Sequence, residues 1–349
     1  MTKGKRVKSI LQQLLAQSKE KVTGHSGSIA ITRRPRQPRI GKHQKVMNGK
    51  RVKVMLEQLE ALEKEKRKIP EHLPVMIRIA GEKICGGTLL DNRHILTAAH
   101  CFFHARTICT RSFDITRWKH VVENPKEMVI EFGGNCVGCT SAKEGDVPTT
   151  SYSSIVEKVM IPKRYVVSQC RRSDIAVLRL NRPIDHKLAS GMDIRIPYEA
   201  KISSNASLEV SGFGYDPDEI DQETRYLNKI EVKLKPCPQN LTESICMVEK
   251  ESNVCMGDSG SGLMEAFASA KNGYKVVHGV VSRGTACKMM KTLLQRKKYG
   301  GNVDDFKGQY FTSTWYYTQF ICKATESRVK IDGNVTCKDL KNIQKILEF

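Results

Sequence analysis

The sequence predicts an all-β fold, and two observations carry that prediction. Short apolar runs recur from about residue 75 onward, and glycine, proline or polar residues separate most of them. Many short strands with turn residues between them are typical of a sandwich or a barrel. The expected strands cover residues 75–80, 128–132, 175–180, 208–212 and 276–281. Near the C-terminal end, residues 312–321 instead predict a helix, with Thr312 or Ser313 as its cap.

The composition fits a globular protein with a very basic start. The chain has 349 residues, of which 40% are hydrophobic, and a net charge of +21. No apolar run reaches the ~18 residues of a membrane span, so we expect none. Residues 1–45 hold twelve Lys and Arg and one acid, Glu20. We interpret them as a solvated leader. A nucleic-acid-binding arm is the alternative, but no aromatic residues are interleaved with the basic excess, and we expect no nucleic-acid partner.

Twelve cysteines predict a disulfide framework and an oxidising compartment. Three glycosylation sequons, at Asn205, Asn240 and Asn334, agree with this interpretation. We therefore expect a secreted glycoprotein. The first residues argue against it, because Gln12 and Gln13 interrupt the apolar core that a signal peptide needs. The expectation of secretion thus assumes that the start of the chain is truncated or mis-assigned.

Three motifs in a fixed order carry the functional prediction. They are CGGTLL at 85–90 with ILTAAHC at 95–101, then SDIAVLRL at 173–180, then CMGDSGSG at 255–262. Together they resemble the motifs of the chymotrypsin family of serine peptidases. The resemblance implies a chymotrypsin-like double six-stranded β-barrel with a C-terminal α-helix. The domains expected from it are a leader or pro-segment at 1–45, a trypsin-like peptidase domain with two barrels at 46–322, and a tail at 323–349.

The resemblance implies a catalytic triad of His100, Asp174 and Ser259. A serine hydroxyl is a poor nucleophile at its free pKa, so a neighbouring base must take its proton. His100 would be that base, and Asp174 would hold the imidazole tautomer. The N–H groups of Gly257 and Ser259 would form the oxyanion hole. The expected activity is hydrolysis of peptide bonds in peptide or protein substrates through an acyl-enzyme, without a cofactor.

The same resemblance implies an inactive zymogen that cleavage activates. Cleavage after Lys45 would free the amino group of Val46, and the new ammonium would pair with Asp258. The expected partners are then an activating protease and protein inhibitors. The stretch from Val46 to Cys85 is longer than the family norm, which is a departure from the pattern.

The residues expected to contact substrate also depart from the family pattern. Asn253 lies six residues before the nucleophile, where trypsins have an aspartate that selects Arg or Lys, so trypsin-like specificity is not expected. The segment expected to pair with the substrate backbone consists of Ser282, Arg283 and Gly284. Arg283 stands where the family has an aromatic residue. The alternative function is therefore a catalytically impaired homologue that acts as a binding or regulatory module.

The resemblance also implies three disulfides, Cys85–Cys101, Cys237–Cys246 and Cys255–Cys287. The remaining six cysteines allow fifteen connectivities, so the sequence does not pair them. They are Cys109, Cys136, Cys139, Cys170, Cys322 and Cys337. A metal site is not expected at His100 and His104, because the zinc-protease motif needs a Glu directly after the first His. Cys101 stands there instead.

Overall fold

The computed structural model describes only part of the chain. The described residues are 74–79, 83–103, 124–139, 146–153, 155–184, 193–216, 224–248, 250, 252–267, 274–300, 308–333, 335–340 and 346–348. The chain divides into two compact units, Met1–Lys66 and Arg67–Phe349, and every described residue belongs to the second. The expected leader, the expected cleavage site at Lys45 and Val46, Cys109 and Asn334 lie outside the described residues. In the described ranges, no helix has the length and apolarity that crossing a membrane requires.

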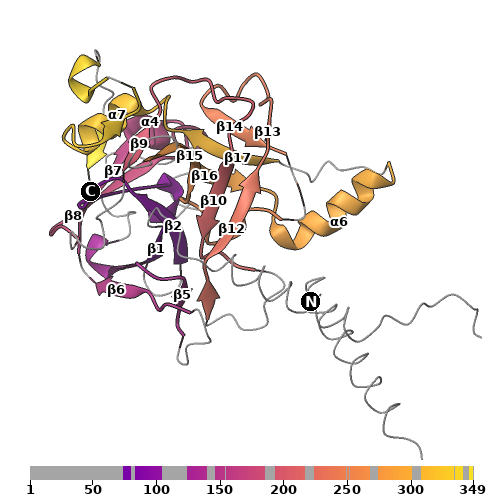
Figure 1. The fold of residues 1–349 in the computed structure, drawn as a ribbon, viewed down its shortest axis with the longest axis horizontal. Helices are drawn as coiled ribbons and strands as arrows, with labels where there is room; N and C mark the ends of the chain where they lie inside the picture. Colours follow the sequence, from indigo (N-terminus) through magenta and orange to yellow (C-terminus); the bar gives the residue numbers. More distant parts are fainter. Residues whose placement is uncertain are drawn as a thin grey trace, which may run out of the picture. The chain divides into compact units, whose positions relative to one another are not determined.

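Eight strands form the first sheet, which is antiparallel throughout and has the order β19-β7-β8-β3-β2-β1-β4-β6. Figure 1 labels β1, β2, β6, β7 and β8 of this sheet. Their bounds are β1 (Pro74–Ile79), β2 (Lys83–Leu89), β3 (His94–Thr97), β4 (Met128–Phe132), β6 (Thr150–Ser153), β7 (Val156–Pro162), β8 (Ala176–Leu180) and β19 (Ile346–Glu348). The inner strands are almost wholly buried, as a curled sheet around its own core requires.

The second sheet has nine strands, seven of them in the order β12-β10-β15-β16-β17-β14-β13. Two more strands extend it: β9 pairs in parallel with β16, and β18 pairs in parallel with β9. The bounds are β9 (Ile194–Ile196), β10 (Leu208–Gly212), β12 (Asn228–Val232), β13 (Leu234–Lys235), β14 (Ser244–Met247), β15 (Gly262–Phe267), β16 (Tyr274–Gly284), β17 (Gln309–Ser313) and β18 (Lys330–Ile331). A small ribbon pairs β5 (Cys136–Val137) with β11 (Arg225–Tyr226). Two curled sheets and few helices confirm the predicted double-barrel, all-β class.

The helices are short. They are η1 (Ala99–Phe102), η3 (Pro125–Glu127), α4 (Lys163–Val167), α6 (Cys287–Lys298), α7 (Thr318–Ala324) and η4 (Cys337–Asp339). The helix predicted at 312–321 is wrong in its first part, because residues 309–313 form β17. Aromatic and β-branched residues at 310–312 favour a strand, and β17 has hydrogen-bonded neighbours on both sides. The helix begins only after the turn at 314–317.

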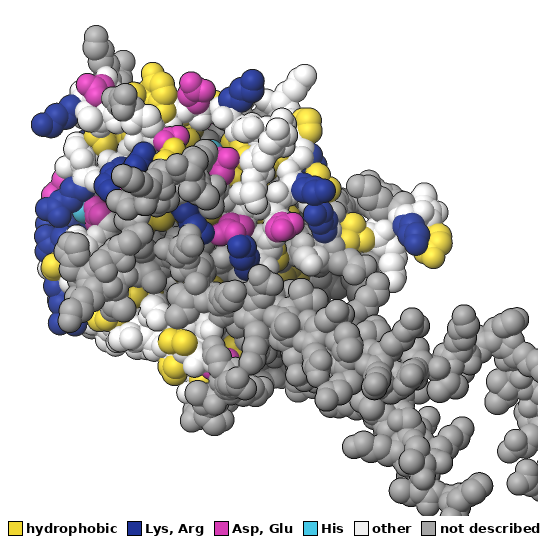
Figure 2. Space-filling model, in the orientation of Figure 1, with side chains coloured by type: hydrophobic (Ala, Val, Ile, Leu, Met, Phe, Trp, Pro, Cys, Tyr) yellow, Lys and Arg dark blue, Asp and Glu magenta, His cyan; other side chains and the backbone are white. Residues whose placement is uncertain are grey.

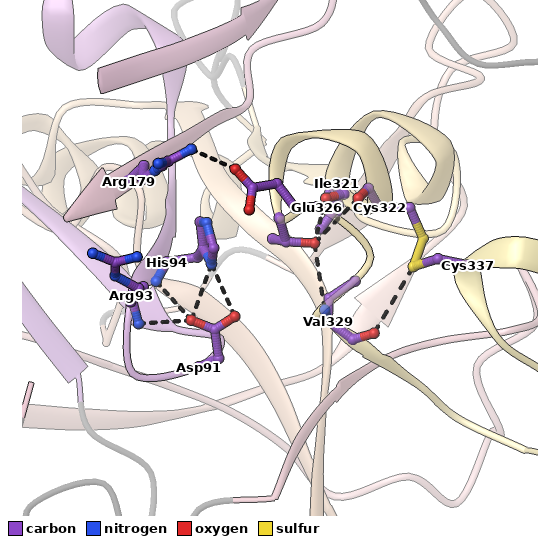
Figure 3. Close-up of polar contacts among 10 residues, drawn as sticks. Asp91, Arg93, His94, Arg179, Ile321, Cys322, Glu326, Val329 and Cys337 are labelled. Carbon is purple, nitrogen blue, oxygen red and sulfur yellow. Dashed lines mark hydrogen bonds and ion pairs between the residues drawn. A yellow bond between two sulfur atoms is a disulfide. The ribbon is translucent and has the colours of Figure 1, made fainter. Parts of the chain in front are cut away.

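The residues after Cys322 pack onto the barrels. Val329 and Ile331 are buried in the same apolar cluster as the first sheet. A disulfide joins Cys322 to Cys337, and Arg179 of β8 forms an ion pair with Glu326 at the end of α7 (Figure 3). These contacts fasten the chain after α7 to the strand that follows Asp174, so they support one wall of the site described next.

Candidate active site

His100 and Asp174 meet because of the pairing between β3 and β8. Thr97, the last residue of β3, lies opposite Ala176, the first residue of β8. His100 follows on η1, and Asp174 precedes β8. The Nδ1 atom of His100 lies 2.8 Å from Asp174 Oδ2, and the His100 backbone N–H donates to Oδ1 at 2.9 Å. One carboxylate therefore fixes both the ring and the backbone of the histidine.

The second barrel also holds Asp174. The Ser282 hydroxyl on β16 donates to Oδ2 at 2.6 Å, and the Thr312 hydroxyl on β17 donates to the Asp174 carbonyl oxygen at 2.8 Å. Burial by itself raises the pKa of Asp174, but the attraction of His100 and the hydrogen bonds from His100 and Ser282 outweigh it, and the pKa lies below its usual value. An ionised Asp174 favours the tautomer with the proton on Nδ1, which leaves Nε2 as the acceptor.

Ser259 lies in the loop before β15, which is bound to both sheets. Its carbonyl oxygen accepts from Gly86 N–H at 2.7 Å, and Gly260 N–H donates to the Val281 carbonyl at 2.8 Å. A Cβ on Gly260, whose φ is +92°, would lie 2.2 Å from Thr97 Oγ1, so only glycine allows this approach. Within the described ranges, the Ser259 hydroxyl forms no hydrogen bond with His100, and such bonds are often long before substrate binds.

The turn before Ser259 leaves two backbone donors available. The Asp258 N–H donates to the Cys255 carbonyl, and the Ser261 N–H donates to the Asp258 carbonyl. Gly257 has a φ of +99°, a conformation that a residue with a Cβ rarely adopts. Among the described residues, the N–H groups of Gly257 and Ser259 donate to no protein group. This arrangement fits the oxyanion hole expected from the sequence.

The Asp258 carboxylate is bound by backbone groups near β10 and in its own loop. The N–H groups of Gly214 and Cys255 donate to its two oxygens at 2.8 and 2.9 Å. Cβ atoms on Gly212 or Gly214 would lie 2.3 Å from the carboxyl group, so the glycines make room for it. Burial raises the pKa of Asp258 to about 6, although these two hydrogen bonds and the charge of Arg225 act in the opposite direction.

A cavity of about 380 Å³ opens beside Ser259. The residues predicted to pair with substrate, Ser282, Arg283 and Gly284, all line it, and so do the disulfide-bonded Cys255 and Cys287. Asn253 was expected at its base, but it is not among the lining residues. Its side chain is buried and its amide donates to the Lys250 carbonyl at 3.3 Å. The structure therefore does not place Asn253 at the cavity wall.

Gln309 is one of the pocket residues that the sequence analysis missed. It is 1% exposed, lines the cavity and donates from Nε2 to the Thr285 carbonyl at 3.1 Å. A Cβ on Gly284 would lie 1.8 Å from Gln309 Oε1, so the glutamine side chain fills the space beside this glycine. The two residues are opposite each other in the β16–β17 pair. Only this long-range register places Gln309 in the pocket, and no local motif signals it.

Comparison with known proteins settles the family. The family model described as Trypsin matches residues 63–295, which is more than half of the chain. The chain belongs to the trypsin family. A similar relative is Trypsin-like protease try-5 of Caenorhabditis elegans, 28% identical over 255 residues that cover 62% of this chain and 76% of that protein. Phenoloxidase-activating factor 3 of Holotrichia diomphalia is 26% identical over 215 residues, which cover 58% of this chain and 57% of that protein.

In this trypsin-family chain, the three disulfides implied by the resemblance are all formed, at Cys85–Cys101, Cys237–Cys246 and Cys255–Cys287. Two pairs that the sequence left open are Cys136–Cys139 and Cys322–Cys337. Cys170 is also disulfide-bonded. The Sγ atoms of Cys85 and Cys101 lie near the His100 ring in a group of possible metal ligands. Both sulfurs belong to a disulfide and are not thiolates, the form that binds metals.

A second His–Asp pair, His94 and Asp91, lies outside the candidate active site and serves as a comparison for His100 and Asp174. His94 Nδ1, on the first residue of β3, lies 2.9 Å from Oδ2 of Asp91 in the turn before that strand, and the two side chains face each other (Figure 3). His94 is 1% exposed, whereas the His100 side chain is 30% exposed. Among the described residues, His100 and Asp174 line a second cavity next to the one beside Ser259, whereas His94 and Asp91 line neither of these two. Of the predicted glycosylation sites, Asn205 and Asn240 are exposed.

Proposed function

We propose that this chain is a serine endopeptidase that uses Ser259, His100 and Asp174. The observation that carries the proposal is the Asp174 carboxylate, which holds the His100 ring beside a second cavity that adjoins the one lined by Ser259, since Ser282 and Arg283 line both. Ser259 Oγ attacks the peptide carbonyl carbon while His100 Nε2 takes its proton. The N–H groups of Gly257 and Ser259 bind the oxyanion. The amine leaves with the proton from His100, and water then releases the acyl group by the reverse proton transfers.

Hydrolysis of casein by the activated chain tests this proposal. We expect cleavage that a fluorophosphonate blocks. The second candidate is a non-catalytic binding module, favoured by the Arg283 cation and the Gln309 side chain in the cleft. An activated chain that neither hydrolyses casein nor reacts with the fluorophosphonate would support that module and contradict the peptidase.

The activation proposal rests on Asp258. Its carboxylate has backbone donors on both oxygens, yet burial still raises its pKa. An ammonium group beside it would supply a full countercharge. We assign this role to the amino group of Val46 after cleavage at Lys45, in a protein made as a zymogen and secreted. The disulfides and the exposed Asn205 and Asn240 support an extracellular glycoprotein.

The uncleaved chain should lose stability as the pH rises past the pKa of Asp258. A pKa raised from 3.8 to about 6 means that the folded protein keeps a proton that the unfolded chain releases. The free energy of unfolding therefore falls between about pH 4 and pH 7, by about 3 kcal/mol from this group. Urea unfolding of the wild type and Asp258→Asn at both pH values measures it. The fall should be about 3 kcal/mol larger for the wild type, and equal falls would contradict the assignment.

Shortening Gln309 should widen the pocket. In Gln309→Ala, kcat/KM for peptides with Phe before the cleaved bond should rise about 10-fold relative to peptides with Ala there. The reason is that the glutamine side chain occupies the space beside Gly284. The control is Gln295→Ala, an exposed position on α6 outside the cavity lining. An unchanged Phe-to-Ala ratio in Gln309→Ala would show that Gln309 does not limit the pocket.

A further inference from the structure

A second cavity, of about 280 Å³, lies next to the first, and three arginines are among the residues that line it. Its lining includes His100, Asp174, Ser282 and Arg283, together with Arg171 and Arg172. Ser282 and Arg283 line both cavities, so the two are neighbours along the end of β16. An extended peptide along this strand rises about 3.3 Å per residue. Two to four residues before the cleaved bond would therefore reach the second cavity.

The three arginines of this second cavity are exposed and unpaired. In the described ranges, the guanidinium groups of Arg171, Arg172 and Arg283 form no ion pair. Arg283 stacks over the Tyr310 ring, 5.6 Å from its centroid. Basic side chains are common on this protein, and Figure 2 shows many Lys and Arg at the surface. Basic charge by itself therefore does not identify a site, whereas three unpaired cations around one cavity do.

The two carboxylates in the same lining, Asp174 and Glu243, bond with groups other than these three arginines. Asp174 is engaged by His100 and Ser282, as described above. Glu243 is 7% exposed. Its Oε1 accepts from the Ser173 N–H at 3.2 Å, and its Oε2 accepts from the Tyr317 hydroxyl. Arg164 lies 3.8 Å from the same Oε2 atom. Both carboxylates thus bond with donors within the protein, and in the described ranges neither forms an ion pair with the three arginines of the second cavity.

The loop that carries Arg171 and Arg172 is held in shape before any peptide binds. The Arg172 N–H donates to Ser168 Oγ at 3.1 Å, and the Arg171 N–H donates to the Ser168 carbonyl at 3.3 Å. Cys170 is disulfide-bonded and donates its N–H to the Tyr165 carbonyl at 3.0 Å. A fixed backbone lowers the entropy cost of binding, so the cations act as a prepared site.

We propose that the second cavity binds acidic side chains of the substrate, two to four residues before the cleaved bond. This inference rests on the proposed peptidase function, because it assigns a substrate class to the same cleft. Peptides with Asp or Glu at these positions would place carboxylates among three cations. Exposed ion pairs are individually weak, and three together give about a 10-fold preference over the neutral amides.

Peptide binding to the cleaved Ser259→Ala protein tests this inference without turnover. The probes are two fluorescein-labelled peptides, Ala-Glu-Glu-Glu-Ala-Ala and Ala-Gln-Gln-Gln-Ala-Ala, measured by fluorescence anisotropy. We expect the Glu peptide to bind about 10-fold more tightly at low salt, and the preference to shrink at about 0.5 M NaCl because salt screens exposed charges. Equal affinity for the two peptides would overturn the inference, whatever the activity assay shows.

Charge-reversing variants test whether the arginines of the second cavity cause the preference for the Glu peptide. Arg171→Glu with Arg172→Glu, in the same Ser259→Ala background, should remove the preference for the Glu peptide. The matched control is Arg182→Glu with Arg328→Glu, which makes the same change in charge at two exposed arginines outside the cavity lining. Equal loss in both variants would mean that overall charge, and not this cavity, attracts the peptide. Fluorophosphonate labelling of both variants with Ser259 intact checks the fold and separately tests the peptidase proposal.

Discussion

Ser259→Ala is expected to lower kcat/KM by about 10⁶-fold and to leave thermal stability nearly unchanged. The loss is large because the nucleophile and its base act as a unit. Stability should hold because, among the described residues, the Ser259 hydroxyl forms no hydrogen bond, and the loop is bound through backbone groups of Gly86, Gly260 and Val281. Steady-state hydrolysis of a peptide and a thermal melt measure the two effects.

Ser261→Ala is the matched control for this prediction. Ser261 lies two residues further on, is 1% exposed, and has a buried hydroxyl with no hydrogen-bond partner in the described part of the chain. It lines neither cavity, so we expect its variant to keep most of the activity. A large fall in melting temperature in Ser259→Ala, or equal activity losses in the two variants, would mean that Ser259 has a structural role.

Asp174→Asn is expected to lower kcat by about 10⁴-fold. Three donors converge on this carboxylate, namely the N–H and Nδ1–H groups of His100 and the Ser282 hydroxyl. An amide offers one acceptor oxygen and two donor hydrogens, so it cannot serve all three. The imidazole then favours the tautomer with its proton on Nε2, which cannot accept the serine proton. Peptide hydrolysis measures kcat, and circular dichroism checks the fold.

The other His–Asp pair supplies the control for Asp174→Asn. In Asp91→Asn the bond to the buried His94 is weakened at a site that lines neither cavity. The pKa of Asp91 lies below its usual value, because its bonds with His94 outweigh the effect of burial. We therefore expect lower stability and unchanged kcat. If Asp91→Asn reduced kcat as much as Asp174→Asn, the contrast between a catalytic and a structural pair would fail.

The class of fold and the candidate site residues could be predicted from the sequence because both depend on local patterns. Short apolar runs mark β4 and β10 at their observed bounds. Each of the three motifs contains a complete turn or strand end. Each of His100, Asp174 and Ser259 is therefore recognised together with the local backbone around it.

Features that depend on long-range register escaped prediction. Gln309 reaches the pocket only through the pairing of β17 with β16. The same pairing holds Thr312 and Ser313 in a strand, where the local residues suggested the start of a helix. The Asn253 side chain bonds to Lys250, which its position relative to Ser259 does not reveal. The second cavity similarly brings together Arg171 and Arg283, which are separated by about a hundred residues in the sequence.

The central claim is that Ser259 becomes a nucleophile once the chain is cleaved. The most direct measurement is fluorophosphonate labelling before and after limited trypsin cleavage, with N-terminal sequencing of the product. The account predicts strong labelling only in the product that begins at Val46, and none in Ser259→Ala. Absence of labelling in a product with that terminus would contradict the peptidase mechanism, and equal labelling of the uncleaved chain would contradict its activation by cleavage.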